Sequence, residues 1–358
     1  MGLQQSVASP STSLGHQGEP QILICGAGIA GLTLANRLEQ LGFKSIWIVE
    51  ADQSLESRPQ GYSLTMQQPG QKALKTLGLL DVVQSCSRWG GGGQHFVHAQ
   101  TGSIIRSIGG GGHQHPVPTR TAKSRRNFYV PRQKLRAILA KSLVATKIIF
   151  SEQIADYEES DDVVTATLRS GRKVSSALLV GCDGVNSAVR KQKLSDRLRY
   201  LGVGIINGIV DSSLALCHAG SLHVLDGSHR LFMKPFRGEQ EAMWQLSFPE
   251  KDLKQIEAIR ALPKEELHAL AMRETSSWCP LYRSIIEVTN PSTLRASGLF
   301  DRDPLLCAEH TGARTALIGD AAHPMSPFIG QGANQAMADS IQLAEALCRC
   351  RDETGRLD

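Results

Sequence analysis

The chain has 358 residues, 41% of them hydrophobic, and a formal net charge of +5. This length and composition suffice for a large buried core and suggest two domains or one large composite unit. The small positive excess is spread along the chain, and no basic run is interleaved with aromatic residues, so we do not expect a nucleic-acid-binding protein.

The first 19 residues are polar and lack the apolar centre of a signal peptide, so we expect a disordered leader at 1–19. No later segment has the length and apolarity of a membrane span. The eight cysteines are scattered, and Cys25 and Cys182 lie in apolar strand-like runs, where buried free thiols are usual. No CxxC pair or His/Cys cluster indicates a metal site. The expected location is the reducing cytoplasm.

A strand, a glycine turn, a helix and a second strand are predicted within residues 22–50. Residues 22–26 form an apolar run of strand length, and an amphipathic helical pattern follows over residues 28–41. A second apolar run at 46–49 ends in Glu50. This order is typical of a dinucleotide-binding βαβ unit.

The residue types in this turn suit a dinucleotide. Gly26 permits a tight turn, Gly28 lets a pyrophosphate approach the backbone, and Gly31 lets the helix pack closely on the strand. Ala30 belongs to the same turn, at a helix N-terminus whose N–H groups favour phosphate. Glu50 follows at about the spacing of the acid that binds an adenosine ribose, which favours FAD or NAD over NADP. The alternative is a glycine turn without a ligand.

Residues 81–124 are expected to form flexible connections around one hairpin. Glycine-rich pieces at 90–93 and 109–112 bracket strand-like runs around 96–98 and 103–105. The basic residues at 120–126 are interpreted as a solvated surface loop.

The middle of the chain alternates between strand and helix patterns. We predict a helix at Arg132–Val144 and a strand at 177–182, which leads into Asp183. Strands are then predicted at 203–210, 221–225, 230–234 and 242–248, followed by helices near 263–273 and 281–288.

A second glycine-containing turn lies towards the other end. Residues 316–318 form a short apolar strand that ends at Gly319-Asp320, and a helical pattern runs over 333–350. Asp320 is placed to bind a polyol hydroxyl. Gly330 and Gly332 open the helix, whose N–H groups would face an electron-rich acceptor such as a flavin pyrimidine edge. The alternative is an ordinary turn and helix.

Three of these segments resemble signatures of the group A flavoprotein monooxygenases, the para-hydroxybenzoate hydroxylase family. They are Gly319-Asp-Ala-Ala-His-Pro with the following Gly-Gln-Gly, Cys182-Asp-Gly-Val-Asn-Ser-Ala-Val-Arg190, and Arg132-Gln-Lys-Leu135. The resemblance covers roughly residues 20–350, and the layout is most similar to the compact tetracycline-inactivating monooxygenases.

The resemblance implies an α/β fold, with a Rossmann-like FAD-binding domain and an inserted strand-rich substrate domain. We assign residues 20–80, 125–195 and 299–350 to the FAD-binding domain. We assign 81–124 and 196–298 to the substrate-binding region.

The residues expected to bind FAD combine the turn described above with those of the resemblance. Arg132 approaches the phosphates or ribityl chain, Asp320 holds the ribityl or pyrophosphate region, and Pro327 shapes the pocket beside the flavin. Asp183 and Arg190 support FAD or NAD(P)H binding, with a purely structural turn as the alternative for Asp183. The full cofactor set is Gly26, Gly28, Ala30, Gly31, Glu50, Arg132, Asp320, Pro327, Gly330, Gln331 and Gly332.

Two departures from the family pattern are visible. Many relatives carry Arg or Lys after the ribose-binding acid, whereas Ala51 follows Glu50 here, with Arg58 as a possible substitute. Relatives of this kind usually continue for several tens of residues beyond the last motif helix, whereas this chain stops at Asp358. We therefore expect weaker support between the two domains.

The implied reaction uses FAD, with NADPH or NADH as co-substrate. The reduced flavin reacts with O2 to form a C4a-hydroperoxide, which hydroxylates a hydrophobic, aromatic or polyketide-like small molecule. Flavin halogenation and Baeyer–Villiger oxygenation are alternatives within enzymes. A non-catalytic FAD-binding redox sensor or pathway scaffold is the alternative outside them.

No catalytic acid or base can be assigned from the sequence, and the oligomeric state is equally open. His223, His229 and Trp244-Gln245 fall on predicted strands, but strand alternation sends only half of such side chains to any one face. His323 is expected to pack beside the flavin rather than to transfer protons.

Overall fold

The structure, a computed structural model, describes residues 18–57, 62–89, 93–108, 127–194, 196–211, 220–237, 240–302, 314–351 and 357. Several expected features lie outside these residues: most of the leader, the glycines at 90–92 and 109–112, the basic residues at 120–126, and Arg58.

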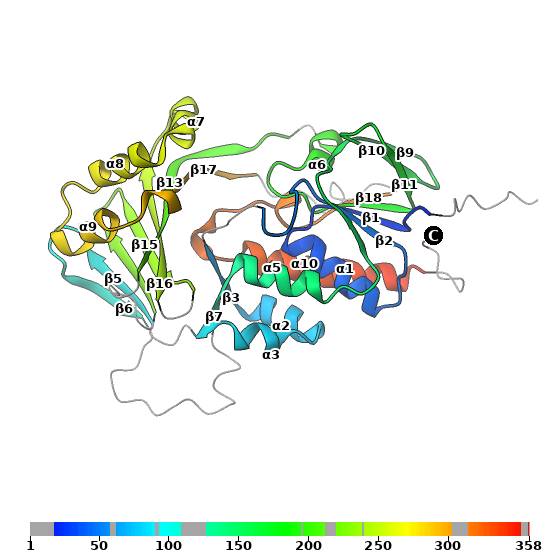
Figure 1. Cartoon of the computed structure of the whole chain (residues 1–358), viewed down its shortest axis with the longest axis horizontal. Coiled ribbons are helices and arrows are strands. Elements are labelled where there is room, and N and C mark those ends of the chain that lie inside the picture. Colours follow the sequence, from blue (N-terminus) through cyan, green and yellow to red (C-terminus); the bar gives the residue numbers. More distant parts are fainter. Residues whose placement is uncertain are drawn as a thin grey trace, which may run out of the picture.

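A five-stranded parallel sheet forms the centre of one half of the molecule (Figure 1). Its strand order is β18-β12-β1-β2-β8, so β12 from the middle of the chain lies between strands that come from its two ends. The first strand forms because its four residues are apolar and are all buried, as expected for a strand covered on both faces. The strands are β1 (Ile22–Cys25), β2 (Ile46–Val49), β8 (Lys147–Ile149), β12 (Leu178–Gly181) and β18 (Thr315–Leu317).

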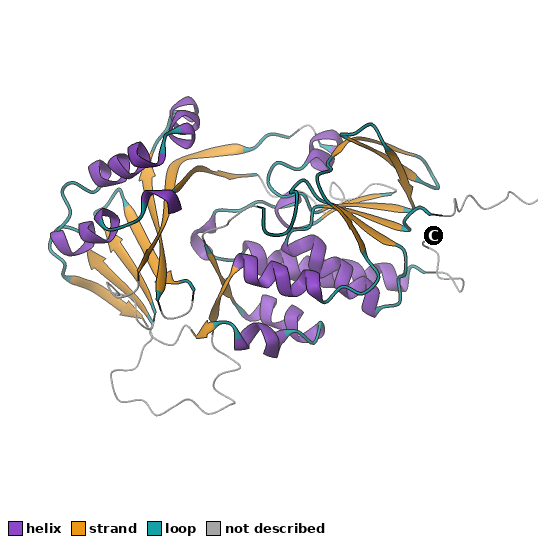
Figure 2. Cartoon of the chain, viewed as in Figure 1, coloured by secondary structure: helices purple, strands orange, loops and turns teal. Residues whose placement is uncertain are grey.

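Helices cover one face of this sheet, and a small antiparallel sheet covers the other (Figure 2). The helical side consists of α1 (Ile29–Gln40), α5 (Arg132–Lys141), α10 (Gly332–Arg349), α2 (Gln68–Thr76) and α3 (Leu80–Ser85). The other side consists of β9 (Ile154–Glu159), β10 (Val164–Leu168), β11 (Lys173–Ser176) and α6 (Ala188–Lys193).

A seven-stranded sheet forms the other half, with helices on its outer face (Figure 1). Its order is β17-β13-β16-β15-β14-β5-β6, antiparallel except for the parallel pair β14 and β5. The strands are β5 (Gln94–His98), β6 (Ile104–Ile108), β13 (Arg199–Asp211), β14 (Ser221–Leu225), β15 (Arg230–Pro235), β16 (Glu241–Pro249) and β17 (Arg295–Asp301). The helices are α7 (Leu253–Ala261), α8 (Lys264–Glu274) and α9 (Pro280–Glu287).

A short three-stranded sheet, β3-β7-β4, lies between the two halves. It consists of β3 (Ser63–Met66), β4 (Arg88–Trp89) and β7 (Phe128–Pro131). β3 contacts the large sheet, because the Nζ of Lys234 on β15 donates a hydrogen bond to the Ser63 carbonyl at 2.8 Å. The open face of the large sheet is therefore turned towards the half that carries the glycine turns.

The α/β fold expected from the sequence is confirmed, and most predicted helices and strands are present. The helix predicted to end at Val144 ends at Lys141, and α7 was not predicted. Glu19, the last residue of the expected disordered leader, is ordered, because its carboxylate accepts a hydrogen bond from the Ser175 N–H at 2.8 Å.

Candidate functional site

The first glycine turn is packed too tightly for side chains at two of its positions. Gly26 has φ +104°, and a Cβ there would lie 2.7 Å from the Cys182 carbonyl oxygen. A Cβ on Gly31 would lie 2.1 Å from the Gly26 carbonyl oxygen. These contacts bring α1 onto β1 and place the turn against the end of β12.

The N-terminus of α1 offers its N–H groups to the space above the turn. Gly28 is the N-cap, no side chain caps the helix, and no acidic residue lies in its first turn. The nearest atom to a Cβ built on Gly28 is the Arg132 Nη2 atom, at 3.9 Å. Helix dipole and guanidinium therefore meet at one place, which favours an anion such as a pyrophosphate. Ala30 is buried beside Gly319, where the second turn approaches α1.

Glu50, at the end of β2, is bound to the first turn. Its Oε2 atom accepts the Ala27 N–H at 2.6 Å, and its Oε1 atom accepts the Asp52 N–H at 2.9 Å. The buried Arg136 guanidinium lies 3.4 Å from Glu50 and 3.1 Å from Asp52. It also donates to the Ala27 carbonyl at 2.8 Å, so it holds the turn and the acid together. The sequence signal for Arg136 was its position one helical turn after Arg132.

Arg132, Asp320 and Gly332 are brought together by the fold. Arg132 is the first residue of α5, and its guanidinium carbon lies 5.9 Å from the centre of the Tyr62 ring. A Cβ on Gly332 would lie 3.6 Å from Asp320 Oδ1. Asp320 is open to solvent although protein surrounds it on most sides, which places it in a concave part of the surface. The surrounding protein raises the pKa of Asp320, and the nearby His323 and Arg132 oppose this.

The second turn is tied to α10 through Asp339. Its Oδ2 atom accepts the Gly319 N–H at 3.0 Å and lies 2.6 Å from His323 Nε2. The hydrogen bond to Asp339 raises the pKa of His323. His323 therefore belongs to the support of the turn.

The loop before α10 is held by the turn that follows β3. It contains a 3₁₀ turn, η5 (Pro327–Ile329), and Gly330 with φ +68°. The Gln67 amide donates to the Ile329 carbonyl at 3.1 Å and accepts from Gln331 at 2.6 Å. Asn334 accepts from the Gln67 N–H and donates to the Thr65 carbonyl, both at 2.9 Å. The sequence reasoning missed Gln67 and Asn334, because their partners are more than 260 residues away.

Asp183 and Arg190 support the turns from behind. Asp183 Oδ2 accepts the Ala188 N–H at 2.7 Å, whereas its buried Oδ1 atom has no hydrogen-bond partner among the described residues. Burial raises the pKa of Asp183. Arg190 is fully buried, pairs with Asp196, and donates to the carbonyls of Ala321 (3.0 Å) and Ala322. The contacts of Arg190 with the second turn are therefore hydrogen bonds to backbone carbonyls.

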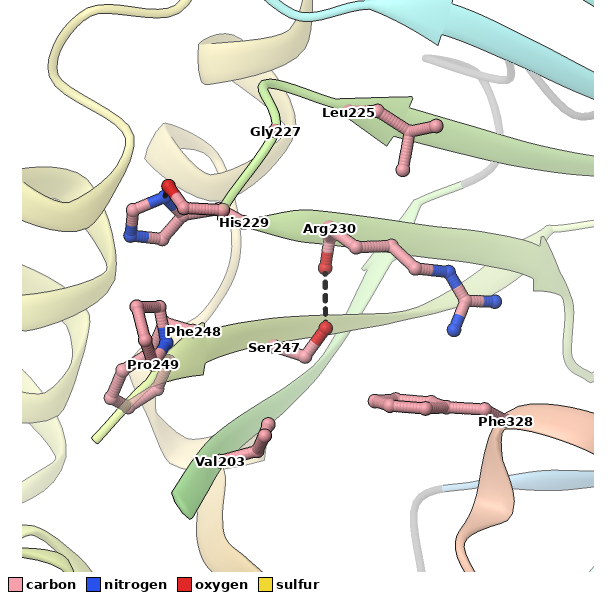
Figure 3. A pocket seen from close by; sticks show the side chains of 10 residues that line it. Val203, Leu225, Gly227, His229, Arg230, Ser247, Phe248, Pro249 and Phe328 are labelled. Atoms are coloured by element: carbon pink, nitrogen blue, oxygen red, sulfur yellow. Dashed lines mark hydrogen bonds between the residues drawn. The ribbon is translucent and has the colours of Figure 1, made fainter. Parts of the chain in front are cut away.

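A cavity of about 370 Å³ lies between the open face of the large sheet and the loop before α10 (Figure 3). The Arg230 guanidinium points towards Phe328, 5.1 Å from the centre of its ring, and lies at the same distance from the Phe232 ring. Strand alternation places Arg230, Phe232 and Lys234 on this face of β15. The lining residues are Val203, Leu225, Gly227, Ser228, His229, Arg230, Ser247, Phe248, Pro249 and Phe328.

The four polar candidates from the sequence lie in different environments. His229 lines the cavity but is bound to Asp226 and Glu274. Trp244 does not face the cavity, because it is fully buried in the core on the helix-covered side, where its Nε1 donates to Thr289 at 2.8 Å. Gln245 donates to Asn207 at 3.2 Å. His223 is buried beside Arg230.

Other classes of site find no support in the described ranges. No group of three His, Cys, Asp or Glu side chains there is arranged to hold a metal ion. Each helix in those ranges is too short or too polar to cross a lipid bilayer.

Comparison with known proteins gives one family and a consistent set of relatives. The family described as "FAD binding domain" matches residues 19–357. The chain is 26% identical to a dual O-methyltransferase/FAD-dependent monooxygenase of Cercospora beticola, covering 95% of this chain but only 43% of that relative. It is 28% identical to the aurachin C monooxygenase/isomerase of Stigmatella aurantiaca, covering 91% of this chain and 80% of that enzyme.

Solved structures show the same fold. Klebsiella pneumoniae HpxO, complexed with FAD and uric acid, superposes with a TM-score of 0.76 at 24% identity, over 95% of this chain and 82% of that one. The tetracycline destructase Tet(51) superposes with a TM-score of 0.68 at 20% identity, over 94% of this chain and 84% of that one. At these identities the likeness concerns the fold alone.

Proposed function

The chain belongs to the FAD binding domain family of group A flavoprotein monooxygenases, and from this premise we propose that it uses NAD(P)H and O2 to hydroxylate a hydrophobic, aromatic or polycyclic metabolite. One observation carries the proposal. Residues 26–31 approach Arg132 and Gly319, which are distant along the chain, and Phe328 of the loop that follows Gly319 lines a cavity together with Arg230.

The residues present fit FAD. The uncapped N-terminus of α1 and Arg132 would hold the pyrophosphate, and Glu50 would accept from the adenosine ribose with the lone pairs that the turn leaves free. Asp320 would bind the ribityl region. The Asp183 Oδ1 atom has no hydrogen-bond partner among the described residues, and Asp183 lies against the first glycine turn, because a Cβ on Gly26 would lie 3.1 Å from Asp183 Cα. The N-terminus of α10, at Gln331 and Gly332, has no side-chain cap and would face the isoalloxazine.

Bound FAD supplies the redox and oxygen chemistry, and the chain supplies position and shelter. Phe328 and η5 would separate the cavity from the flavin edge. Gln67 and Asn334 would hold this loop in place, because their hydrogen bonds connect it to the end of β3. Arg230 would bind a negatively charged oxygen, such as that of a phenolate or enolate, on a ring that lies between the sheet and Phe328.

The GxGxxG pattern occurs once in the sequence, at residues 26–31, so we propose that the nicotinamide co-substrate binds transiently beside FAD. We also propose a reducing, cytoplasmic location. The described cysteines support it, because Cys25, Cys86, Cys182, Cys279, Cys348 and Cys350 are all free.

The test combines flavin reduction with product analysis. The purified FAD-containing protein is mixed with NADH or NADPH in air, with and without a panel of phenolic and polyketide compounds. We expect substrate-stimulated oxidation of one nicotinamide and a product that carries one oxygen atom from 18O2 by mass spectrometry. A flavin that neither nicotinamide reduces would contradict the proposal and favour a non-catalytic FAD protein. A chlorinated or ring-expanded product would indicate halogenation or Baeyer–Villiger oxygenation instead.

A further inference from the structure

A row of side chains crosses the open face of the large sheet beside the cavity. Phe96, His223 and Phe232 are paired in register on β5, β14 and β15. The His223 ring stacks on Phe96, with centroids 4.3 Å apart and planes at 17°, and it is tilted against Phe232 at 4.9 Å. Only 6% of His223 is exposed, so the two rings fix its plane.

The hydrogen bonds of His223 determine which ring nitrogen carries the proton. Arg230 Nη2 and Nε lie 3.1 and 3.3 Å from His223 Nδ1. A guanidinium can only donate, so Nδ1 must accept and the proton must reside on Nε2. Nε2 then donates to Ser221 Oγ at 3.3 Å. Burial and the Arg230 charge lower the pKa of His223 to about 4, in agreement with a neutral ring.

Arg230 lacks the partner that a partly buried guanidinium normally has. Within the described part of the chain, no carboxylate forms an ion pair with it, and its contacts are the neutral His223 and the rings of Phe232 and Phe328. Burial lowers the pKa of Arg230. An arginine side chain has many rotamers, and an acceptor that fixes one of them reduces the cost of ordering it when a ligand binds.

We propose that His223 is the positioning residue of the substrate site. Its Nδ1 atom holds two donors of Arg230, so that the remaining N–H groups face the cavity and bind the oxygen of a planar organic anion. This inference rests on the proposed function, because it takes the cavity beside Phe328 as the substrate site.

The test measures anion selectivity in the FAD-containing protein. Benzoate and its neutral isostere benzamide are titrated, and binding is followed by calorimetry. We expect the wild type to prefer benzoate and Arg230→Met to lose this preference. His223→Asn keeps an acceptor at the δ position and should retain benzoate affinity within about threefold. His223→Gln and His223→Phe remove that acceptor and should weaken benzoate binding about tenfold, the effect of one charge-assisted hydrogen bond. Benzamide binding should change little.

Matched controls separate the possible failures. His95→Phe changes a histidine that alternation places on the opposite face of β5, and it should leave benzoate affinity unchanged. Equal benzoate affinity in His223→Asn and His223→Gln would overturn the positioning role while Arg230 remained an anion site. A wild type without preference for benzoate would overturn the anion site itself. Flavin reduction by NAD(P)H, measured in the same samples, reports on the proposed function independently of either result.

Discussion

Lys234 is a buried cation without a carboxylate partner in the described residues. Its exposed fraction is 5%, and its Nζ donates to the Ser63 carbonyl at 2.8 Å and to Thr65 Oγ1 at 3.3 Å. The rings of Tyr129 and Phe232 lie 5.3 and 5.6 Å from it. Replacing Lys234 with Met keeps the length of the side chain and removes the charge. We expect this variant to be more stable than the wild type near neutral pH.

The magnitude follows from the pKa of the amine. Burial lowers the pKa of Lys234 from 10.5 to about 7, a difference that corresponds to ~5 kcal/mol. The unfolded chain binds one more proton than the folded chain between these two values, so wild-type stability rises with pH in that window and is lowest below it. The two lost hydrogen bonds offset about 2 kcal/mol. Met should therefore stabilise the protein by ~1–3 kcal/mol at pH 6.

The assay is urea unfolding of both proteins at pH 6 and pH 9, with the same excess of FAD because bound cofactor raises apparent stability. We expect the advantage of Met to fall by ~3 kcal/mol between the two conditions. Lys254→Met, at an exposed position on α7, serves as the control and should change stability little at either pH. A stability gap for Lys234→Met that is the same at both pH values would refute the reasoning.

Four further substitutions test the cofactor turns. Gly31→Ala places a Cβ 2.1 Å from the Gly26 carbonyl oxygen and should lower the melting temperature of the protein. Gly28→Ala has room for its Cβ and should reduce only the FAD content, measured by absorbance at about 450 nm. Equal melting temperatures for the two variants would contradict this difference. Arg136→Met leaves Glu50 and Asp52 buried without their cation and should cost ~3–5 kcal/mol in chemical unfolding, so a loss below ~1 kcal/mol would show that the cluster is not coupled. His323→Asn removes a group whose pKa is raised by Asp339, a stabilisation that is complete below pH 6.5 and lost as pH rises through the folded value. Its destabilising effect in thermal unfolding should be larger at pH 6 than at pH 9, and the reverse order would contradict the pairing.

Local patterns were sufficient to predict most of the helices and strands, whereas the resemblance to a family indicated which distant segments meet. The apolar strand at Ile22–Cys25, the helix that begins at Arg132 and the helix after Gly332 follow from periodicity and turn residues that act over a few positions. α7 was missed because it is short and buries only Ile256 and Ile259, so its sequence shows a single helical repeat.

The contacts that complete the site could not be predicted from one sequence. Arg136 forms ion pairs with Glu50 and Asp52, which are distant along the chain. Gln67 likewise accepts a hydrogen bond from the distant Gln331. The strand containing Arg230 and Lys234 was predicted, but alternation does not show which face meets β3 and which meets α7–α9. The parallel pairing of β14 with β5 also lacks a local signal.

The position of β18 has a consequence for biosynthesis. This strand covers the outer side of β12 in the five-stranded sheet, yet it is translated long after β1, β2 and β12. A nascent chain on the ribosome therefore carries β12 as a bare edge until residues 315–317 emerge, and bare edges recruit other strands. We therefore expect this edge to be the part of the nascent chain most prone to pair with other chains before synthesis is complete.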